Sequence, residues 1–217
     1  MIFPELSFAA HGSFRHTHRR LGADVLLFAG LVVLLNLHLV GIGSPLSWVF
    51  FPQALIEGQW WRLLTHPLVH VSPYHLFLDG GAFVLLYHGL SEKRAGRKRA
   101  YVGVAGLSSL AGAMAFAPQL GTTGLCGLSG IAHGLMAVSG LEMIGDGVHR
   151  RTGWITFGCV AGKSLYEVYR GEVVFEFLHM GMCGVPLAAC HLGGVVGATL
   201  LFWGFQLNDR LVSCPTN

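Results

Sequence analysis

The sequence predicts an all-α polytopic membrane protein with six transmembrane helices. Of its 217 residues, 53% are hydrophobic and only 12% are charged, and the mean hydropathy of +0.57 lies outside the range of soluble domains. Apolar segments of about 20 residues, the length that crosses a bilayer, recur six times along the chain. The Lys and Arg residues collect in short stretches between these segments, which is typical of membrane topology. No nucleic-acid partner is therefore expected.

The first predicted span covers 21–42 and follows a polar, arginine-bearing leader at 1–20. Its basic leader resembles that of a signal peptide. However, the span is long, contains Asp24 and lacks a clear small-x-small cleavage site before Pro45. We therefore interpret it as a retained membrane helix.

The connection at 43–72 is too polar to span the membrane and too apolar for an ordinary solvated loop. It contains aromatic rings of the kind that collect at the lipid–water boundary. We expect this first outer loop to lie in the interface of the outer leaflet. The rings are Trp48, Phe50, Phe51, Trp60 and Trp61.

Five further spans follow from segment length and apolar content. The second is predicted to return the chain to the cytoplasm, and the third is rich in glycine and alanine, which permits close helix contact. The fifth is the least apolar, and Lys163 and Glu167 can pair there at i,i+4 spacing. The predicted spans are 73–90, 100–118, 126–144, 153–169 and 186–207.

The positions of the basic residues predict the orientation. If the basic clusters share one side, the positive-inside rule makes that side the cytoplasm, and 11 of the 14 Lys and Arg residues then lie there. Both termini are predicted to be cytoplasmic: a leader at 1–20, one six-span domain at 21–207 and a tail at 208–217. The clusters are Arg15, Arg19 and Arg20; Lys93, Arg94, Arg97, Lys98 and Arg99; Arg150 and Arg151; and Arg210.

The cysteine and histidine spacings do not indicate a metal site. The five cysteines contain no C-x-x-C pair, and no set of ligands has metal-site spacing. We expect buried free thiols, no metal and no cofactor, while one disulfide near the outer face stays open as an alternative. The cysteines are Cys126, Cys159, Cys183, Cys190 and Cys214, of which Cys126, Cys183 and Cys190 would lie near that face.

Ser129 stands between glycines at the predicted start of the fourth span. Gly127 and Gly130 permit other backbone to approach the serine closely, and the first N–H groups of a helix lack partners and can face an oxyanion. This pattern favours a nucleophile. The alternative is a packing surface, because small residues with a serine are also common where membrane helices meet.

Ser129 and His191 lie at matching depths, each a few residues inside its span from the outer side. His75 and Asp79 enter from the same side on the second span. Polar groups inside a membrane are costly and are functional candidates, and a neutral imidazole is the commonest base for activating a serine. Gly194 follows His191 by one turn and would let the sixth helix press against the fourth. Alternatively, His191 only makes a hydrogen bond across helices.

Three groups of residues resemble the motifs of rhomboid intramembrane serine proteases. They are GLSG at 127–130, His191 with Gly194, and WRLLTHPLVH at 61–70 followed by HLFLD at 75–79. The resemblance extends over about 60–207. It implies that Ser129 is the nucleophile and His191 the base, in a dyad without a third acidic member. His75 would be the oxyanion-side histidine.

The remaining residues of the loop motif match rhomboid residues that have structural roles. We expect Arg62 to anchor the loop, and His66 and His70 to hold it by hydrogen bonds. Within the superfamily, the chain is similar to the rhombosortase branch, which is thought to process proteins with a C-terminal Gly-Gly-type anchor. This finer resemblance is carried by the compact length, by His133 after the serine motif, and by Lys163 and Glu167 ahead of Val185 and Pro186.

Two positions depart from the usual rhomboid pattern. Asp79 stands where the family usually has asparagine, and an ionised carboxylate there would repel an oxyanion, so we expect a protonated or turned-away side chain. The alternative is that Asp79 orients His191 as a third member of a triad. His133 lies one turn from Ser129 on the same helix face, where many rhomboids have an aromatic residue. It is expected to stack on His191, with bonding to His191 or competing as the base as alternatives.

The sequence therefore predicts a serine endopeptidase that cleaves the membrane anchors of other proteins near the outer face. Its expected partners are membrane-anchored substrates and the lipid bilayer, and the resemblance implies a bacterial inner membrane. The weakly apolar fifth span is the expected gate for substrate, while oligomeric state has no signal in the sequence. One alternative is a catalytically silent rhomboid-like protein that binds membrane helices. Another is a small proton-coupled transporter, although the sequence lacks the inverted repeats that are typical of transporters.

Overall fold

A computed structural model describes residues 23–174 and 176–213 of the chain. The predicted leader at 1–20, Cys214 and the last residues of the tail lie outside the described residues. The regular secondary structure of the described residues is helical, apart from an isolated antiparallel bridge between Phe50 and Leu125. The long helices are α1 (Ala23–Leu35), α4 (Pro73–Gly89), α5 (Ala95–Phe116), α7 (Ser129–Gly145), α8 (Arg150–Arg170) and α9 (Ala188–Ser213).

The short helices lie in the connections between the long ones. Two belong to the first outer loop, namely α2 (Pro52–Ile56) and α3 (Arg62–Thr65), and α6 (Leu120–Thr123) lies between α5 and α7. Four are single 3₁₀ turns: η1 (Leu37–Val40), η2 (Pro45–Ser47), η3 (His66–Leu68) and η4 (Glu176–His179).

Each of the six predicted spans corresponds to one long helix, but several boundaries differ. For example, α9 ends at Ser213 rather than at 207. The first predicted span runs to 42, whereas α1 ends at Leu35. Asn36 explains this end, because its side-chain amide donates to Val32 O at 2.7 Å and to Leu68 O at 2.6 Å. A local pattern could not predict a stop that depends on a partner 32 residues away. In the third span, the helix starts at Ala95 rather than 100, since Arg and Lys are good helix formers.

One helix among the described residues is long and apolar enough to cross a membrane by length and composition alone, namely Ala188–Val212 within α9. Leu26–Leu35 in α1 is a shorter apolar stretch. Of the other long helices, α1, α4 and α7 have 13, 17 and 17 residues, and α5 and α8 contain several charged residues. The six crossings therefore stay a prediction.

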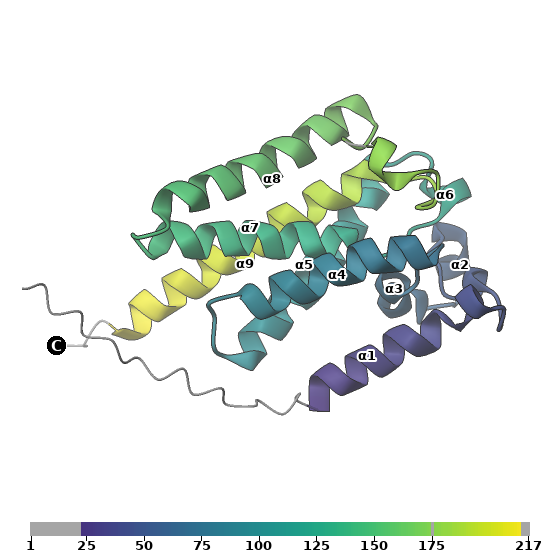
Figure 1. Ribbon diagram of the computed structural model, residues 1–217, viewed down its shortest axis with the longest axis horizontal. Helices are drawn as coiled ribbons and strands as arrows, with labels where there is room; N and C mark the ends of the chain where they lie inside the picture. The colour runs from purple at the N-terminus through teal and green to yellow at the C-terminus, as the bar shows by residue number, and fades with distance from the viewer. Residues whose placement is uncertain (1–22, 175, 214–217) are drawn as a thin grey trace, which may run out of the picture.

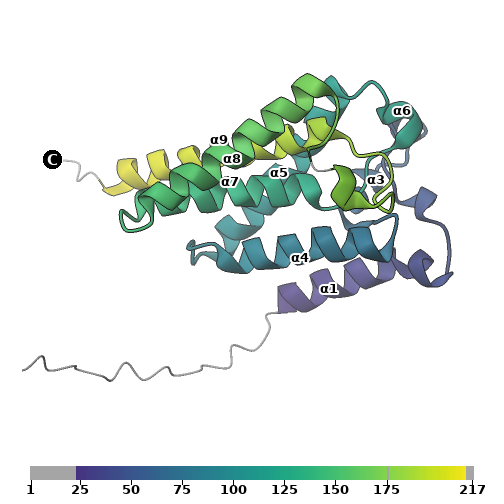
Figure 2. The same cartoon turned by 45° about the horizontal axis from the view of Figure 1, so that its top comes forward.

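The long helices form an elongated bundle (Figure 1). In both views α8 and α1 lie on opposite sides, with α7 and α4 between them (Figure 2). The short helices α2, α3 and α6 gather at one end, near the starts of α7 and α9. The α4–α5 loop, the α7–α8 turn and the end of α9 lie at the other end. We call these the loop end and the basic end, because the second carries the basic clusters of 91–99 and 150–151.

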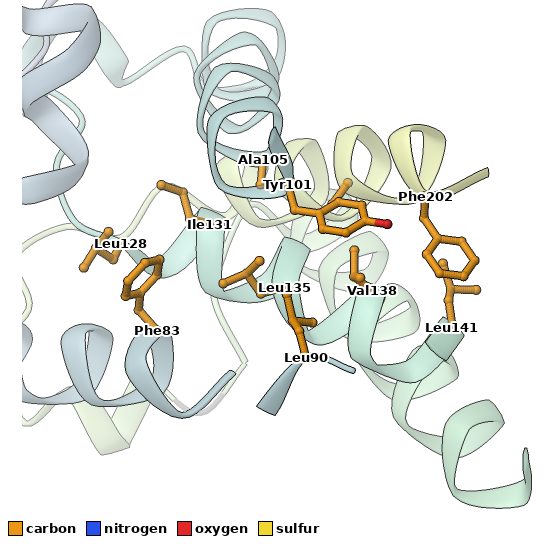
Figure 3. Packing of buried hydrophobic residues seen from close by; sticks show 11 residues of the cluster. Phe83, Leu90, Tyr101, Ala105, Leu128, Ile131, Leu135, Val138, Leu141 and Phe202 are labelled. Atoms are coloured by element: carbon orange, nitrogen blue, oxygen red, sulfur yellow. The ribbon is translucent and has the colours of Figure 1, made fainter. Parts of the chain in front are cut away.

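Helix α7 is central to the hydrophobic core (Figure 3). One apolar stripe runs along it at helical spacing, and residues from α4, α5 and α9 pack against that stripe. Every member is at most 7% exposed, so the first residue of α7, Ser129, is held by a helix buried along its length. The stripe is Leu128, Ile131, Leu135, Val138 and Leu141, and its partners are Phe83, Leu90, Tyr101, Ala105, Ala198 and Phe202.

Helix α9 crosses α7 with the two backbones in contact, as the small residues predicted. A Cβ atom added at Gly194 would lie 2.0 Å from the carbonyl oxygen of Gly130. One added at Gly134 would lie 2.8 Å from the carbonyl oxygen of Gly194. No side chain fits at either position without moving a helix.

The first outer loop is tied to the segment that carries the serine. The buried guanidinium of Arg62 donates to the carbonyl oxygens of Leu46 and Val49, which confirms that it anchors the loop. The carbonyl of His66 accepts from the N–H of Gly127 at 3.0 Å. Burial lowers the pKa of both His66 and His70 to about 4, so these two loop histidines are neutral at pH 7.

The prediction for the aromatic residues of this loop is partly wrong. Trp48, Trp60 and Trp61 are 37%, 63% and 47% exposed, as expected for rings at a boundary. Phe50, however, is fully buried in a cluster with residues such as Leu110. The hydrogen bonds between Phe50 and Leu125 pull this ring inward, a contact that composition does not reveal.

Candidate active site

Ser129 is the first residue of α7 and follows a tight turn at Gly127, whose φ is 97°. A Cβ added at Gly127 would lie 2.8 Å from Asp79 Oδ2 and 2.9 Å from His75 Nε2. One added at Gly130 would lie 1.9 Å from Ser109 Oγ. Both glycines are thus required by close contact. As the start of a helix, this position also leaves N–H groups without intrahelical acceptors.

His191 reaches Ser129 from the first turn of α9. Its Nε2 lies 3.2 Å from Ser129 Oγ, and its side chain is buried. The two residues that the sequence placed at matching depth are therefore in hydrogen-bond contact. Cys190 lies beside them, with its Sγ 3.9 Å from Ser129 Oγ.

Glu167 contacts Nδ1 of His191, the ring nitrogen that does not face Ser129. Its Oε2 lies 2.7 Å from His191 Nδ1, and the side chain is fully buried. Its Oε1 lies 2.6 Å from Lys163 Nζ, which confirms the predicted i,i+4 pair, and accepts from Val174 N at 2.9 Å. The resemblance implied no acidic third member, so this contact was missed. A carboxylate inside a predicted span was the signal that could have found it.

His133 stacks on His191, as expected. The ring centroids are 3.9 Å apart and the planes differ by 9°. His133 Nδ1 lies 2.8 Å from the carbonyl oxygen of Ser129, and its Nε2 lies 2.9 Å from Lys163 Nζ. Both ring nitrogens are thus occupied, which leaves His133 no lone pair for the serine. Of the three roles considered, stacking is the one observed.

His75 and Asp79 lie next to each other on α4 and line the same cavity as Ser129. Asp79 Oδ2 lies 3.1 Å from His75 Nε2, although the angle does not meet hydrogen-bond criteria, and Val71 N donates to His75 Nδ1 at 3.4 Å. Asp79 is therefore turned toward His75. The nitrogen of His191 that the triad alternative assigns to Asp79 is held by Glu167 instead.

A cavity of about 500 Å³ connects these groups at the loop end of the bundle. Its lining includes Ser129, His191, His75 and Asp79, which all came from the sequence. The lining also includes segments of the loop between α8 and α9, which the motifs did not indicate. In chemical terms, a hydroxyl, a base and helix N–H groups share one partly enclosed space, which suits acyl transfer.

One group of potential metal ligands occurs in the described residues. Donor atoms of His133, Glu167 and His191 all lie within 4.8 Å of one another. Lys163 Nζ contacts two of these residues, so its positive charge opposes a metal ion there. The expectation of no metal stays a prediction.

The four cysteines in the described residues, Cys126, Cys159, Cys183 and Cys190, are free thiols. The disulfide left open by the sequence is therefore not formed between Cys126, Cys183 and Cys190. Cys126 and Cys183 line the cavity together with Cys190.

The arrangement of motifs agrees with a family model for the rhomboid domain, which matches residues 57–207. The chain belongs to the rhomboid family. Rhomboid proteins are integral membrane proteins that act on membrane-embedded substrates. They are generally serine intramembrane proteases, although inactive members exist. This rhomboid is accordingly an intramembrane protease or a homologue of one. A search of curated proteins finds no match to the chain.

Proposed function

We propose that this rhomboid is a serine endopeptidase that cleaves membrane-anchor segments of other proteins. The observation that carries the proposal is the 3.2 Å contact between Ser129 Oγ and His191 Nε2 at a cavity. Serine is a poor nucleophile until a base takes its proton, and this contact supplies the base. Ser129 and His191 are the proposed catalytic residues.

The reaction follows the usual course of acyl transfer. His191 Nε2 takes the hydroxyl proton as Ser129 Oγ attacks the scissile carbonyl carbon. The oxyanion that forms faces the N–H groups at the start of α7 and the His75 side of the cavity. His191 then gives the proton to the leaving amine as the C–N bond breaks. A water molecule, deprotonated by His191, attacks the acyl carbon, and His191 returns the proton to Ser129 Oγ as the bond between the acyl carbon and Oγ breaks.

The proposed membrane arrangement has six crossings, with the site opening to the outer side and both termini in the cytoplasm. The basic clusters of 91–99 and 150–151 lie at the end of the bundle opposite the cavity, as the positive-inside rule requires. The exposed tryptophans of the first outer loop lie at the cavity end. Among the helices that the structure describes, α9 meets the length and apolarity expected for a span.

A membrane helix must unwind before it is cut, because its carbonyls are bonded internally. Helix-breaking Gly or small residues near the cut are therefore expected. We propose C-terminal Gly-Gly-type anchors as substrates, which corresponds to a rhombosortase role. The second candidate is a silent helix-binding relative, which Asp79 in place of asparagine favours.

Labelling by a serine-directed phosphonate tests the proposal. The full chain should be labelled, whereas Ser129→Ala should not, and Ser139→Ala on the same helix serves as the matched control. The full chain should also release a co-expressed protein that bears a Gly-Gly-type anchor, in a manner that requires Ser129. Absent labelling, or labelling that persists in Ser129→Ala, would favour the silent relative.

A further inference from the structure

We infer that Glu167 is a positioning residue that completes a Ser129–His191–Glu167 triad, and that Lys163 and His133 hold its carboxylate in place. The inference deepens the proposed function and rests on it. It concerns residues on α8 and α7 that have no role in a mechanism with Ser129 and His191 alone.

The first step concerns the protons of His191. An ionised carboxylate can only accept hydrogen bonds, so the 2.7 Å contact with Glu167 Oε2 places a proton on His191 Nδ1. A neutral imidazole then has its lone pair on Nε2, which lies 3.2 Å from Ser129 Oγ. This is the tautomer that a general base needs. Glu167 therefore selects the reactive form of His191 and orients its ring.

The second step concerns the charge of Glu167. A fully buried carboxylate is costly unless it is paired and hydrogen-bonded. Glu167 has three donors: Lys163 Nζ at 2.6 Å, Val174 N at 2.9 Å and His191 Nδ1. Lys163 is 28% exposed, so its ammonium reaches the carboxylate while remaining partly solvated. Pairing with Lys163 keeps Glu167 ionised, so a negative charge lies beside the imidazolium that forms on His191 during the reaction.

The third step concerns His133, which closes the network into a ring of contacts. A backbone carbonyl only accepts, so the 2.8 Å contact with the oxygen of Ser129 places the proton of His133 on Nδ1. Its Nε2 then accepts from Lys163 Nζ at 2.9 Å. Because its ring also stacks on His191, His133 restrains both the lysine and the base.

All of these contacts are satisfied when Lys163 is charged, Glu167 is ionised, and both histidines are neutral with the proton on Nδ1. No described donor in the ring faces another donor. A carboxylate with a structural role alone would not require this agreement. It requires only a partner, which Lys163 already supplies.

The test compares Glu167→Gln with Glu142→Gln in the purified full chain in lipid vesicles. Glu142 is a matched control, because its carboxylate accepts from Ser91 N and Glu92 N at the basic end, away from the cavity. A glutamine at 167 can donate to Nδ1 and so favours the unreactive tautomer. We expect Glu167→Gln to lower kcat by on the order of 10³–10⁴ with KM unchanged. Glu142→Gln should stay within about twofold.

A second measurement needs no variant. Nitrogen-15 NMR of labelled histidine, assigned by comparison with His191→Asn, should show the Nδ1–H tautomer of His191 in the unaltered protein. This readout keeps the inference falsifiable if Glu167→Gln does not fold. The double variant Lys163→Met with Glu167→Gln removes both charges of the ion pair, so no unpaired charge is left at the buried position, and it should fold while keeping the loss of kcat.

The possible results separate the two proposals. An Nε2–H tautomer in the unaltered protein, or a Glu167→Gln variant as active as Glu142→Gln, would overturn the triad while leaving a Ser129-dependent protease. A protein that is inactive and unlabelled even without substitution would instead overturn the proposed function. Partial recovery of kcat in Glu167→Asp, which keeps an acceptor, would support the positioning role.

Discussion

Substitution of Gly194 by alanine should separate Ser129 from His191, the proposed catalytic pair. The added methyl carbon would lie 2.0 Å from the carbonyl oxygen of Gly130, where backbone meets backbone. Since ordinary C–O contacts are about 3.2 Å or more, α9 has to move from α7 by about 1 Å. His191 lies one turn from Gly194 on α9, so its 3.2 Å contact with Ser129 would lengthen beyond hydrogen-bond range.

We expect about a 100-fold lower rate of phosphonate labelling and of anchor cleavage, as for a misplacement of about 1 Å. Overpacking should also lower the free energy of unfolding by about 1–3 kcal/mol. Gly204→Ala on the same helix is the matched control, because a Cβ there meets nothing within 4 Å. A Gly194→Ala variant that is folded and labels as fast as Gly204→Ala would refute the reasoning.

Three further predictions concern histidines and the acid beside them. Asp79→Asn should retain or raise cleavage across neutral pH, since Asp79 faces His75 rather than the base; a large loss in the rate assay would make its carboxylate essential. His133→Phe keeps a ring that stacks on His191 but loses the hydrogen bonds of the imidazole. We expect kcat to fall about tenfold, which is equivalent to one hydrogen bond of about 1.4 kcal/mol, whereas His191→Phe should abolish cleavage. Burial lowers the pKa of His66 and His70 from 6.5 to about 4, so below pH 6.5 the unfolded chain binds more protons than the folded one. Stability should therefore fall between pH 6.5 and 4, by up to about 3 kcal/mol for each histidine, and an unfolding temperature that is constant over this range would contradict their burial as neutral groups.

Much of the bundle could be predicted because most of the long helices coincide with a local run of mainly apolar residues, with α8 the least apolar of them. Ser129 and His191 could be paired because glycines mark the serine and because depth along a helix follows from counting residues. The pairing of Lys163 with Glu167 follows from i,i+4 spacing alone. What spacing does not give is the rotation of α8 about its axis, which decides that Glu167 faces His191.

Other errors have the same origin in contacts between distant segments. Phe50 has the composition of an interfacial residue, but its hydrogen bonds with Leu125 place it in the core. Asn36, the residue after α1, bonds to Leu68, a partner that the pattern of one helix does not indicate. Patterns of one helix therefore predict the element, while partners across the bundle decide its end and its facing side.

The attachment of α8 has a consequence for the order of events during turnover. This helix corresponds to the span expected to admit substrate, yet it supplies Glu167 to the base and packs backbone against α7, where a Cβ at Gly153 would lie 2.6 Å from Ile144 N. If α8 swings outward at the loop end, the carboxylate leaves His191 with it. Admission and cutting would then exclude one another in time. A substrate helix that binds while α8 is open and then dissociates would leave uncleaved. Only a substrate that stays bound until α8 returns to its closed position would be cleaved.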